Sequence, residues 1–420
     1  MLTVEEALEL VEQHARPLAP RRVPLGDAPG LVLAEDVASE VNSPPYDKSL
    51  MDGYAVRSGD REAERRVLEE IAAGAVPRLP VTPGTASRIM TGAPLPEGAD
   101  AVVPLEQTEL LDASRVRLHQ TDPAPGQHVL RLGTTLRAGD VVLYAGALLR
   151  PIEIAILAEI GRAVVTARPR PRIAILPTGN ELVAVGEKPT NGQIRNSNGP
   201  MLHACAARVG AEAIELGIAR DDRAELTRWI EQGLAADVLV LSGGVSAGKF
   251  DLVPQVLAEL GVEQVFHKVA LRPGKPLWFG VKQNDDRRVL VFGLPGNPMS
   301  SFVCFELFVR PAVAALAGQG FTGLQTMTAK LTHAYDHAGG RAACLPARVT
   351  TASAHGETAT HDRDRIAQPV LPSAAAFSVE ILPWHGSADL ATVARANALV
   401  RLPIEKQQLA PGTALDVLLI

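Results

Sequence analysis

The strongest constraint on the fold is an alternation of apolar, strand-like runs with helical runs between residues 172 and 318. The strand-like runs are rich in Val, Leu and Ile, and the segments between them are typical of helices. Such alternation predicts a doubly wound parallel sheet with helices on both of its faces. The strand-like runs are RIAIL, EAIELGIA, DVLVLSGG and RVLVFGLPG, and the helical runs are GPMLHACAARVG, RAELTRWIEQGL, DLVPQVLAELG and SSFVCFELFVRPAVAALAG, the last with a kink expected at Pro311.

Two further helices frame another region of the chain. TVEEALELVEQHARPL begins with a capping-box pattern, Thr3 followed by Glu6, and carries apolar residues at helical spacing. RPIEIAILAEIG, which stops at Gly161, is the second helix. We expect these two helices to pack side by side, so that the segment between them forms a domain inserted into theirs.

The chain therefore has the pattern of a multidomain α/β protein. The inserted region is rich in Val, Gly and Pro with short alternating runs, which indicates β-strands, apart from a helical patch expected near residues 61–70. The C-terminal region ends in runs typical of paired strands in a small barrel or sandwich. The four predicted domains are an elongated helical domain of residues 1–43 plus 135–168, an inserted β-rich domain of 44–134, an α/β domain of 169–326 and a C-terminal β domain of 327–420.

Composition narrows the function classes. The formal net charge is -6, so nothing overall draws the chain to a nucleic-acid backbone, and we expect no nucleic acid as a partner. The three cysteines are scattered and no Cys-x-x-Cys occurs, which argues against a zinc knuckle or a disulfide framework. The N-terminus has no apolar signal core and no apolar run is long enough to cross a bilayer. We therefore expect a cytoplasmic location and no membrane partner.

Ligands of an open parallel sheet bind beyond the carboxyl ends of the strands, so the loops there are the candidates for a site. Glycines let backbone N–H groups converge on an anion, and the loop from Ser242 to Gly248 suits a phosphate in this way. Taken alone, a glycine-rich turn after a strand is more often an ordinary turn. The loop residues selected by this rule are Thr178, Gly179, Glu181, Asp221, Asp222, Ser242, Gly243, Gly244, Ser246 and Asp251, with the LPGNP turn after the last strand.

Charged side chains near these loops suggest how an anion is held. Lys268, Arg272 and Lys275 lie in HKVALRPGKP, although a solvated basic turn has the same character. Carboxylates beside a phosphate would repel it unless a divalent cation lies between them. Singly, each such carboxylate is more often a solvated or helix-capping residue. The candidate ligands of Mg²⁺ or another divalent cation are Glu181, Asp221 and Asp251.

Several motifs follow one another in a specific order along nearly the whole chain. They are SLMDGYAV, RIMTGAPLPEGADAVV, RIAILPTGNELV, NGQIRNSNGPML, SGGVSAGKFDLVPQVLAELG, FHKVALRPGKP, LPGNPMSSF and HGSADLATVARANALVRLP. Together they resemble the molybdopterin molybdenumtransferase family, the MoeA-type proteins that include the E domain of gephyrin. Each motif alone is modest evidence, but the ordered set is specific.

The resemblance implies an activity and an assembly. Family members insert molybdenum from molybdate into adenylylated molybdopterin and release AMP, which is the final step of molybdenum-cofactor synthesis. They use Mg²⁺ or another divalent cation and form homodimers with four subdomains per chain, and the molybdopterin adenylyltransferase would be a further partner. Tungstate and molybdate are close in size and charge, so no motif separates them.

The resemblance also assigns roles to residues. Asp52-Gly53 alone reads as an ordinary solvated turn, but Asp52 and Thr91 match functional residues that the inserted domain presents to the partner's sheet. The implied catalytic residues are Asp52, Thr91, Glu181, Asp221, Asp251, Lys268, Arg272 and Lys275. The implied substrate-binding residues are Thr178, Gly179, Asn198, Ser242, Gly243, Gly244, Ser246, Gly248, Pro295, Gly296, Asn297, Pro298 and Ser387.

One residue departs from the family pattern. Thr135, in LGTTL, stands where the family usually carries an aspartate that is thought to help hold molybdate or its cation. Thr135 can donate a hydrogen bond but carries no charge. The chain is then either an insertase with a weaker ligand set or a diverged paralogue that carries molybdopterin or finished cofactor without inserting metal. A scaffold like gephyrin is a third reading, which no long linker supports.

Overall fold

The structure is a computed structural model, and it describes residues 1–245, 252–284, 287–351 and 377–420 of the chain. The described residues form two compact units. The first unit comprises Met1–Arg21, Gly30–Val32 and Ala167–Ile420, and the second comprises Arg22–Pro29 and Leu33–Thr166. The predicted division into four domains is finer than these two units and stays a prediction.

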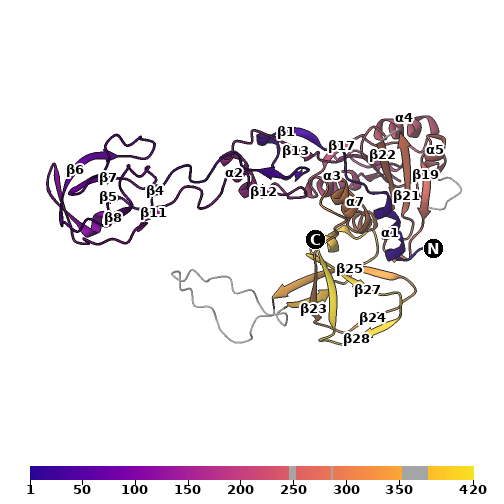
Figure 1. Ribbon diagram of the computed structural model, residues 1–420. Coiled ribbons are helices and arrows are strands. Elements are labelled where there is room, and N and C mark those ends of the chain that lie inside the picture. Colours follow the sequence, from indigo (N-terminus) through magenta and orange to yellow (C-terminus); the bar gives the residue numbers. More distant parts are fainter. Residues whose placement is uncertain (246–251, 285–286, 352–376) are drawn as a thin grey trace. The chain divides into compact units, whose positions relative to one another are not determined.

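A six-stranded sheet is the centre of the first unit (Figure 1). Four adjacent strands of this sheet are parallel, as the alternation of strands and helices predicts. Two further strands extend the sheet through antiparallel pairings, which the sequence pattern did not indicate: β21 runs against β22, and β19 runs against β21 and so has the direction of the four parallel strands. The spatial order is β17 (Glu212–Glu215), β14 (Arg172–Pro177), β18 (Val238–Ser242), β22 (Arg287–Leu294), β21 (Trp278–Asn284) and β19 (Glu263–His267).

Helices cover both faces of this sheet because successive strand residues point to opposite sides. Ile173 and Ile175 of β14 join one hydrophobic cluster with α3, α6 and α7, whereas Ala174 and Leu176 join another with α4 and α5. The predicted doubly wound arrangement is therefore confirmed. The helices are α3 (Asn198–Arg208), α4 (Arg223–Gly233), α5 (Val253–Glu259), α6 (Pro298–Cys304) and α7 (Arg310–Leu316).

The helical stretch Pro298–Leu316 is interrupted where a kink was expected. A π-helical segment, Phe305–Val309, separates α6 from α7 and ends just before Pro311. Proline has no N–H to donate to the preceding turn, and the π-helical turn lies where that hydrogen bond is missing. The expectation that no apolar run is long enough to cross a bilayer is wrong for this stretch: among the described residues it is the one helix that passes by length and composition. Its apolar window is 94% buried inside the protein, as in a core helix.

The N-terminal helix α1 (Val4–His14) has the predicted capping box, in which Thr3 Oγ1 accepts from Glu6 N and Thr3 N donates to Glu6 Oε2. Its apolar stripe, however, joins the cluster of the first unit and packs on α7. We expected α1 to pack beside residues 150–161, which belong to the second unit. The structure shows the contact of α1 with α7, and the expected contact stays a prediction.

A closed five-stranded barrel forms the C-terminal part of the first unit, as the paired strands predicted there suggested. Each barrel strand pairs with two neighbours, and β27 returns to β25 to close the ring. The ring order is β25 (Ala342–Thr351), β26 (Phe377–Ile381), β23 (Thr326–Leu331), β29 (Ala414–Leu419) and β27 (Ala398–Leu402). Smaller elements here are β20 (Leu271–Arg272), which pairs with β25, β24 (Tyr335–His337), β28 (Gln407–Leu409) and α8 (Leu390–Val393).

The second unit contains a six-stranded sheet and one α-helix, α2 (Pro151–Glu159). The helical patch predicted near residues 61–70 is wrong, because Glu64–Ile71 forms the strand β6 between β7 and β10. Its charges pair across strands, with Arg117 Nη2 3.0 Å from Glu64 Oε1, so tertiary context overrides the local helical spacing. The spatial order is β8 (Ala101–Pro104), β5 (Gly53–Val56), β7 (Thr85–Ile89), β6, β10 (Arg115–Leu118) and β9 (Thr108–Asp112).

The strands not yet named are short. They are β1 (Arg21–Pro24), β2 (Val32–Leu33), β3 (Val37–Ala38), β4 (Lys48–Ser49), β11 (Val129–Leu130), β12 (Val141–Leu143), β13 (Val164–Arg168), β15 (Leu182–Val183) and β16 (Ile194–Arg195).

Candidate active site

A cavity of about 540 Å³ opens at the carboxyl ends of the parallel strands. Residues that follow or end β14, β18 and β22 form its base, as expected for an open α/β sheet. A segment that follows the barrel strand β26 adds Ala388 and Leu390 to the wall. The predicted site residues that line the cavity are Thr178, Glu181, Asn198, Ser242, Pro295, Gly296, Asn297 and Pro298.

The loop after β14 places one carboxylate at this cavity. Gly179 has φ +150°, and a Cβ built there would lie 2.4 Å from Glu181 Oε2. The close approach means that the Glu181 side chain folds back over the glycine, and a residue with a side chain would displace it. The loop is held at its base by Gly179 N, which donates to Ala219 O at 3.0 Å. Gly179 therefore has a local reason to be glycine that the strand-end rule alone does not give.

Asn198, at the first turn of α3, ties the loops after β18 and β22 together. Its Nδ2 donates to Ser242 Oγ at 2.6 Å and to Gly296 O at 2.7 Å. Ser242 Oγ lies 3.3 Å from Ser301 Oγ, which in turn donates to Pro295 O. One buried amide thus sets the relative position of two of the loops that bound the cavity.

Two buried polar oxygens at the cavity lack a hydrogen-bond partner within the described residues. They are Thr178 Oγ1 and Asn198 Oδ1, on side chains that are 3% and 8% exposed. Buried polar groups are nearly always hydrogen-bonded, so these two oxygens are open to a partner such as a water or a ligand. Gly243 lies against the same threonine, because a Cβ there would be 2.5 Å from Thr178 O.

The segment around Ser387 is fastened to the LPGNP turn. Asn297 Nδ2 donates to Ser387 Oγ at 2.8 Å, and Met299 N donates to Ser387 O at 3.0 Å. Hydrogen bonds from Thr392 and from His385 hold the pKa of Asp389 well below its usual range and fix the turn that carries Ser387. The structure therefore brings the predicted Ser387 to the LPGNP turn.

The remaining predicted acid of the first unit, Asp221, lies beside the same loop but does not line the cavity. Its Oδ2 accepts from Asn180 N at 3.3 Å, and its own N–H donates to Asn180 Oδ1 at 3.2 Å. Asp251, Ser246 and Gly248 lie outside the described residues. Within the described residues no group of three or more His, Cys, Asp or Glu side chains is placed to hold a metal ion.

The predicted basic residues sit on the turn that precedes β21. Lys268 has φ +77°, an uncommon backbone conformation for a residue with a side chain, and its N–H donates to Leu277 O at 2.8 Å. The guanidinium of Arg272 lies 5.9 Å from the ring of Trp384, and Lys275 is exposed. Pro276, next to Lys275, lines the cavity.

Asp52 and Thr91 form a pair within the second unit. Asp52 Oδ1 accepts from Thr91 N and from Thr91 Oγ1, each at 2.7 Å. The two hydrogen bonds lower the pKa of Asp52, and the backbone one contributes most. Asp52 is exposed, so it keeps its charge and remains available to a ligand.

Two observations add to the sequence analysis. Arg195 lines the cavity, with its Nε donating to Glu187 O at 3.0 Å, and sequence reasoning missed it although it lies in the motif NGQIRNSNGPML. Thr135, in turn, is engaged within the second unit, where its Oγ1 donates to Ser43 O at 2.6 Å. The hydroxyl therefore supports a local turn.

This geometry is that of an α/β protein with a cavity at its strand-end loops, to which a segment after the barrel strand β26 contributes part of the wall. Two family models match the chain: the MoeA N-terminal region (domain I and II) at residues 2–161, and a probable molybdopterin binding domain at residues 174–315.

Relatives match over nearly the whole chain. A molybdopterin molybdenumtransferase of Staphylococcus aureus is 33% identical over 100% of this chain and 95% of its own length. Molybdopterin molybdenumtransferase 2 of Mycobacterium tuberculosis is 34% identical over 99% of both chains. Two solved structures of molybdopterin biosynthesis MoeA proteins from Pyrococcus horikoshii match with TM-scores of 0.78 and 0.76, at 30% and 27% identity, covering 100% of this chain and 99% and 100% of theirs. The chain belongs to the molybdopterin molybdenumtransferase (MoeA) family.

Proposed function

We propose that this protein transfers molybdenum from molybdate to adenylylated molybdopterin and releases AMP, the final step of molybdenum-cofactor synthesis. The observation that carries this proposal is the strand-end cavity with its two unpaired buried oxygens, in a chain of this family. Its volume of about 540 Å³ lies within the range of small-molecule sites. Molybdate is the natural metal substrate in this reading, although tungstate has the same shape and charge.

The residues of the cavity suit the parts of such a substrate. Thr178 and Asn198 present hydrogen-bonding oxygens to polar groups such as those of a pterin ring. Arg195 lines the same wall, and Lys268, Arg272 and Lys275 on the neighbouring turn supply positive charge for the phosphates. Gly243 and Gly244 have positive φ and no side chains, and a Cβ on either would collide with Thr178.

A divalent cation fits this donor set. Glu181 at the cavity and Asp221 in the adjoining loop are two carboxylates, and Mg²⁺ is commonly held by one or two carboxylates together with substrate phosphates. When bound, the cation would neutralise phosphate charge and polarise the phosphoanhydride. Asp251, outside the described residues, is proposed as a further ligand.

The proposal is tested by incubating the purified protein with adenylylated molybdopterin, molybdate and Mg²⁺. We expect AMP and active cofactor to appear in equal amounts, and neither to appear when molybdate is left out or EDTA is added. Absence of both products in the complete mixture contradicts the enzymatic reading.

The alternative is a paralogue that carries molybdopterin or finished cofactor without inserting metal. Thr135 favours it, because the residue has no charge where the family usually has an aspartate. The same assay separates the two functions. A carrier retains molybdopterin through gel filtration but releases no AMP.

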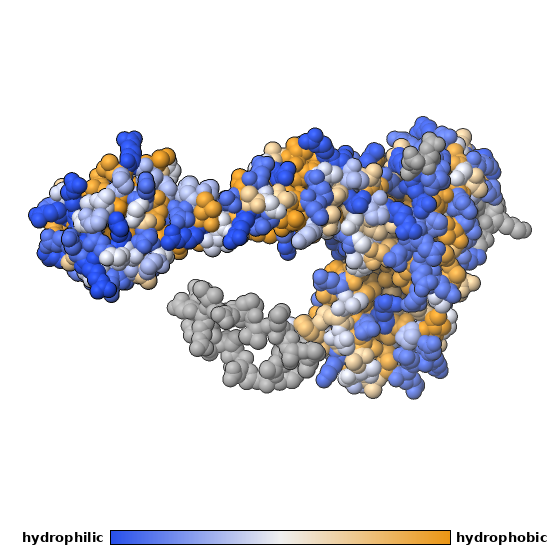
Figure 2. Space-filling model, viewed as in Figure 1, coloured by the Kyte–Doolittle hydropathy of each residue, from blue (hydrophilic) through white to orange (hydrophobic). Residues whose placement is uncertain are grey.

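We also propose that the protein works as a homodimer in the cytoplasm, with Asp52 and Thr91 of one subunit completing the site of the other. The second unit exposes a group of large apolar side chains around α2, and Figure 2 shows apolar surface over this segment. Apolar patches of this kind are typical of protein interfaces. The exposed residues are Val141, Tyr144, Leu148, Ile152 and Val164. The molybdopterin adenylyltransferase that makes the substrate is a further proposed partner.

Mixing two inactive variants tests the composite site. Asp52→Ala removes the contribution of the second unit, and Asn198→Ala disrupts the strand-end loops of the first. If each site combines both units from different subunits, a mixed dimer has one site with neither change. Random exchange of subunits at equal amounts then makes half the dimers mixed, so activity should return to about a quarter of the unmodified value. If each subunit supplies its whole site, the mixture stays inactive.

A further inference from the structure

A second cavity, of about 780 Å³, lies at the opposite ends of the strands of the same sheet. Arg172 and Arg287 are the first residues of β14 and β22, and Asp237 directly precedes β18, so this cavity is at the amino ends of the parallel strands. The six residues of β14 separate it from the candidate active site by about 17 Å, at about 3.3 Å per strand residue. The two cavities are therefore distinct sites.

The charge of this second cavity contrasts with that of the chain. Six arginines and two carboxylates line it, which makes the lining positive by four, whereas the whole chain has a formal net charge of -6. Arginine presents a planar fork of donors that matches phosphate and carboxylate oxygens. The lining arginines are Arg16, Arg21, Arg170, Arg172, Arg287 and Arg288.

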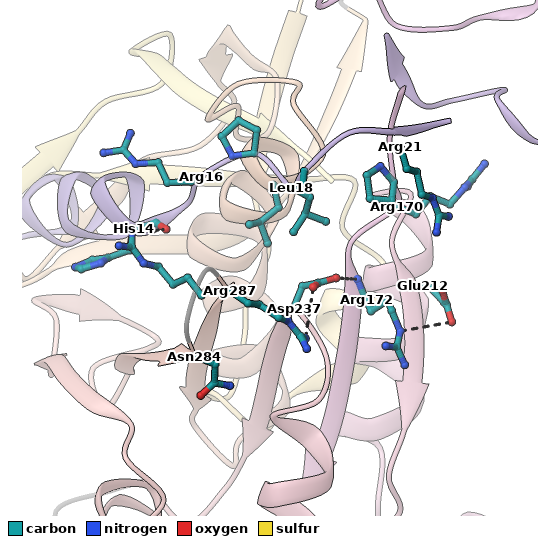
Figure 3. A pocket seen from close by; sticks show the side chains of 15 residues that line it. His14, Arg16, Leu18, Arg21, Arg170, Arg172, Glu212, Asp237, Asn284 and Arg287 are labelled. Carbon is teal, nitrogen blue, oxygen red and sulfur yellow. Dashed lines mark hydrogen bonds and ion pairs between the residues drawn. The ribbon is translucent and has the colours of Figure 1, made fainter. Parts of the chain in front are cut away.

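The two carboxylates do not neutralise this charge. Asp237 Oδ1 lies 3.5 Å from Arg287 Nη2, and Glu212 Oε1 lies 4.0 Å from Arg172 Nε, as Figure 3 shows. Arg16 and Arg21 are exposed, and within the residues that the structure describes no carboxylate forms an ion pair with either. Positive charge therefore remains for a ligand.

A histidine, His14, also lines this cavity. Burial lowers the pKa of His14, and Arg288 and Arg16 lower it further, while Glu263 opposes them. Beside the arginines the cavity has an apolar wall, formed by Pro17, Leu18, Ala19, Pro169 and Leu316.

We propose that this second cavity binds a small molecule that carries phosphate groups, with the phosphates between the arginines and an organic part against the apolar wall. The volume is within the range of small-molecule sites, and the combination of a cationic side with an apolar side suits a nucleotide better than a bare ion. Arginine and phosphate form paired, charge-assisted hydrogen bonds, so such a ligand would be held specifically. The proposal is independent of the activity of the strand-end cavity.

Calorimetric titration of the full-length protein with AMP, ATP and inorganic pyrophosphate tests the proposal. We expect saturable binding of at least one of these probes that weakens as salt is raised, because exposed charges are screened. The double variant Arg16→Ala/Arg21→Ala should weaken that binding at least tenfold. Neither side chain has an ion-pair partner in the described structure, so the fold should tolerate the change.

Two comparisons locate the binding. The matched control Arg61→Ala/Arg78→Ala removes two exposed arginines of the second unit and should leave the affinity unchanged. Asn198→Ala disturbs the strand-end cavity and should also leave it unchanged. Because the strand-end cavity also takes up phosphates in the proposed function, the affinity of the second cavity is read from the binding that remains in Asn198→Ala. The proposal is overturned if no probe binds to Asn198→Ala, if binding there survives the further change Arg16→Ala/Arg21→Ala, or if an oligoglutamate peptide binds while the phosphate compounds do not.

Discussion

Replacing Asn198 by alanine should lower the rate of molybdenum insertion by about a hundredfold. The side chain donates to Ser242 Oγ and to Gly296 O, and so sets the relative position of two loops at the cavity. Displacing binding groups by about 1 Å can cost about two orders of magnitude in rate. The substitution also leaves the two acceptors without their donor. The free energy of unfolding should therefore fall too, by about 1–3 kcal/mol for each unpaired group.

A matched variant separates the effect on the site from the effect on stability. Asn397, in the barrel region, also makes two hydrogen bonds, with Val349 N at 2.7 Å and Val349 O at 2.9 Å. Asn397→Ala should lower the melting temperature but keep most of the activity, measured as AMP release. If Asn198→Ala keeps more than a tenth of the activity, or if Asn397→Ala loses as much, the strand-end cavity is not where the reaction takes place.

The strand-end loops could be predicted from sequence because the residues that indicate them are neighbours in the chain. An apolar run of five or six residues followed by Gly, Ser or Thr indicates a buried strand that ends at a ligand site, and β14 and β18 follow that pattern. The barrel was also foreseen, from short alternating runs separated by turn residues. In each case the residues that define the element are close together in the chain.

The features that escaped prediction depend on contacts distant in sequence. The strand β6 has the charge spacing of a helix, and only its pairing with β7 and β10 makes it a strand. The apolar stripe of α1 does not say which surface covers it, and the structure provides α7. Arg195 stands at the cavity because β16 pairs with β15, a two-residue contact that no periodicity signals.

The helix that starts at the LPGNP turn contains a buried ion triad that sequence reasoning did not find. Glu306 is fully buried in the π-helical segment, where its carboxylate accepts from Arg208 of α3 and, at 2.5 Å, from Arg310 Nε of α7. A carboxylate in such a place depends on its partners, because a buried charge without compensation is costly. The triad therefore holds α3 against the helix that begins at Pro298, beside the candidate active site.

Arg310→Met should lower the free energy of unfolding by about 3 kcal/mol, because it leaves the buried carboxylate with one partner in place of two. Glu306→Leu should cost much less. It removes the buried charge and keeps an apolar side chain of similar volume, while the side chains of Arg208 and Arg310 are 42% and 19% exposed and can reach water. The double variant Glu306→Leu/Arg310→Met should recover most of the loss, since no carboxylate is then left unpaired.

Urea unfolding followed by tryptophan fluorescence measures these differences in the right part of the molecule. The three tryptophans, Trp229, Trp278 and Trp384, all belong to the first unit, so the signal reports on that unit alone. If Glu306→Leu and Arg310→Met lower the free energy of unfolding equally, then the arginines lose as much stabilisation without the carboxylate as the carboxylate loses without Arg310. A double variant as unstable as Arg310→Met would show that Arg310 stabilises the protein by packing. Arg208 of α3 would then be the residue that compensates the buried carboxylate.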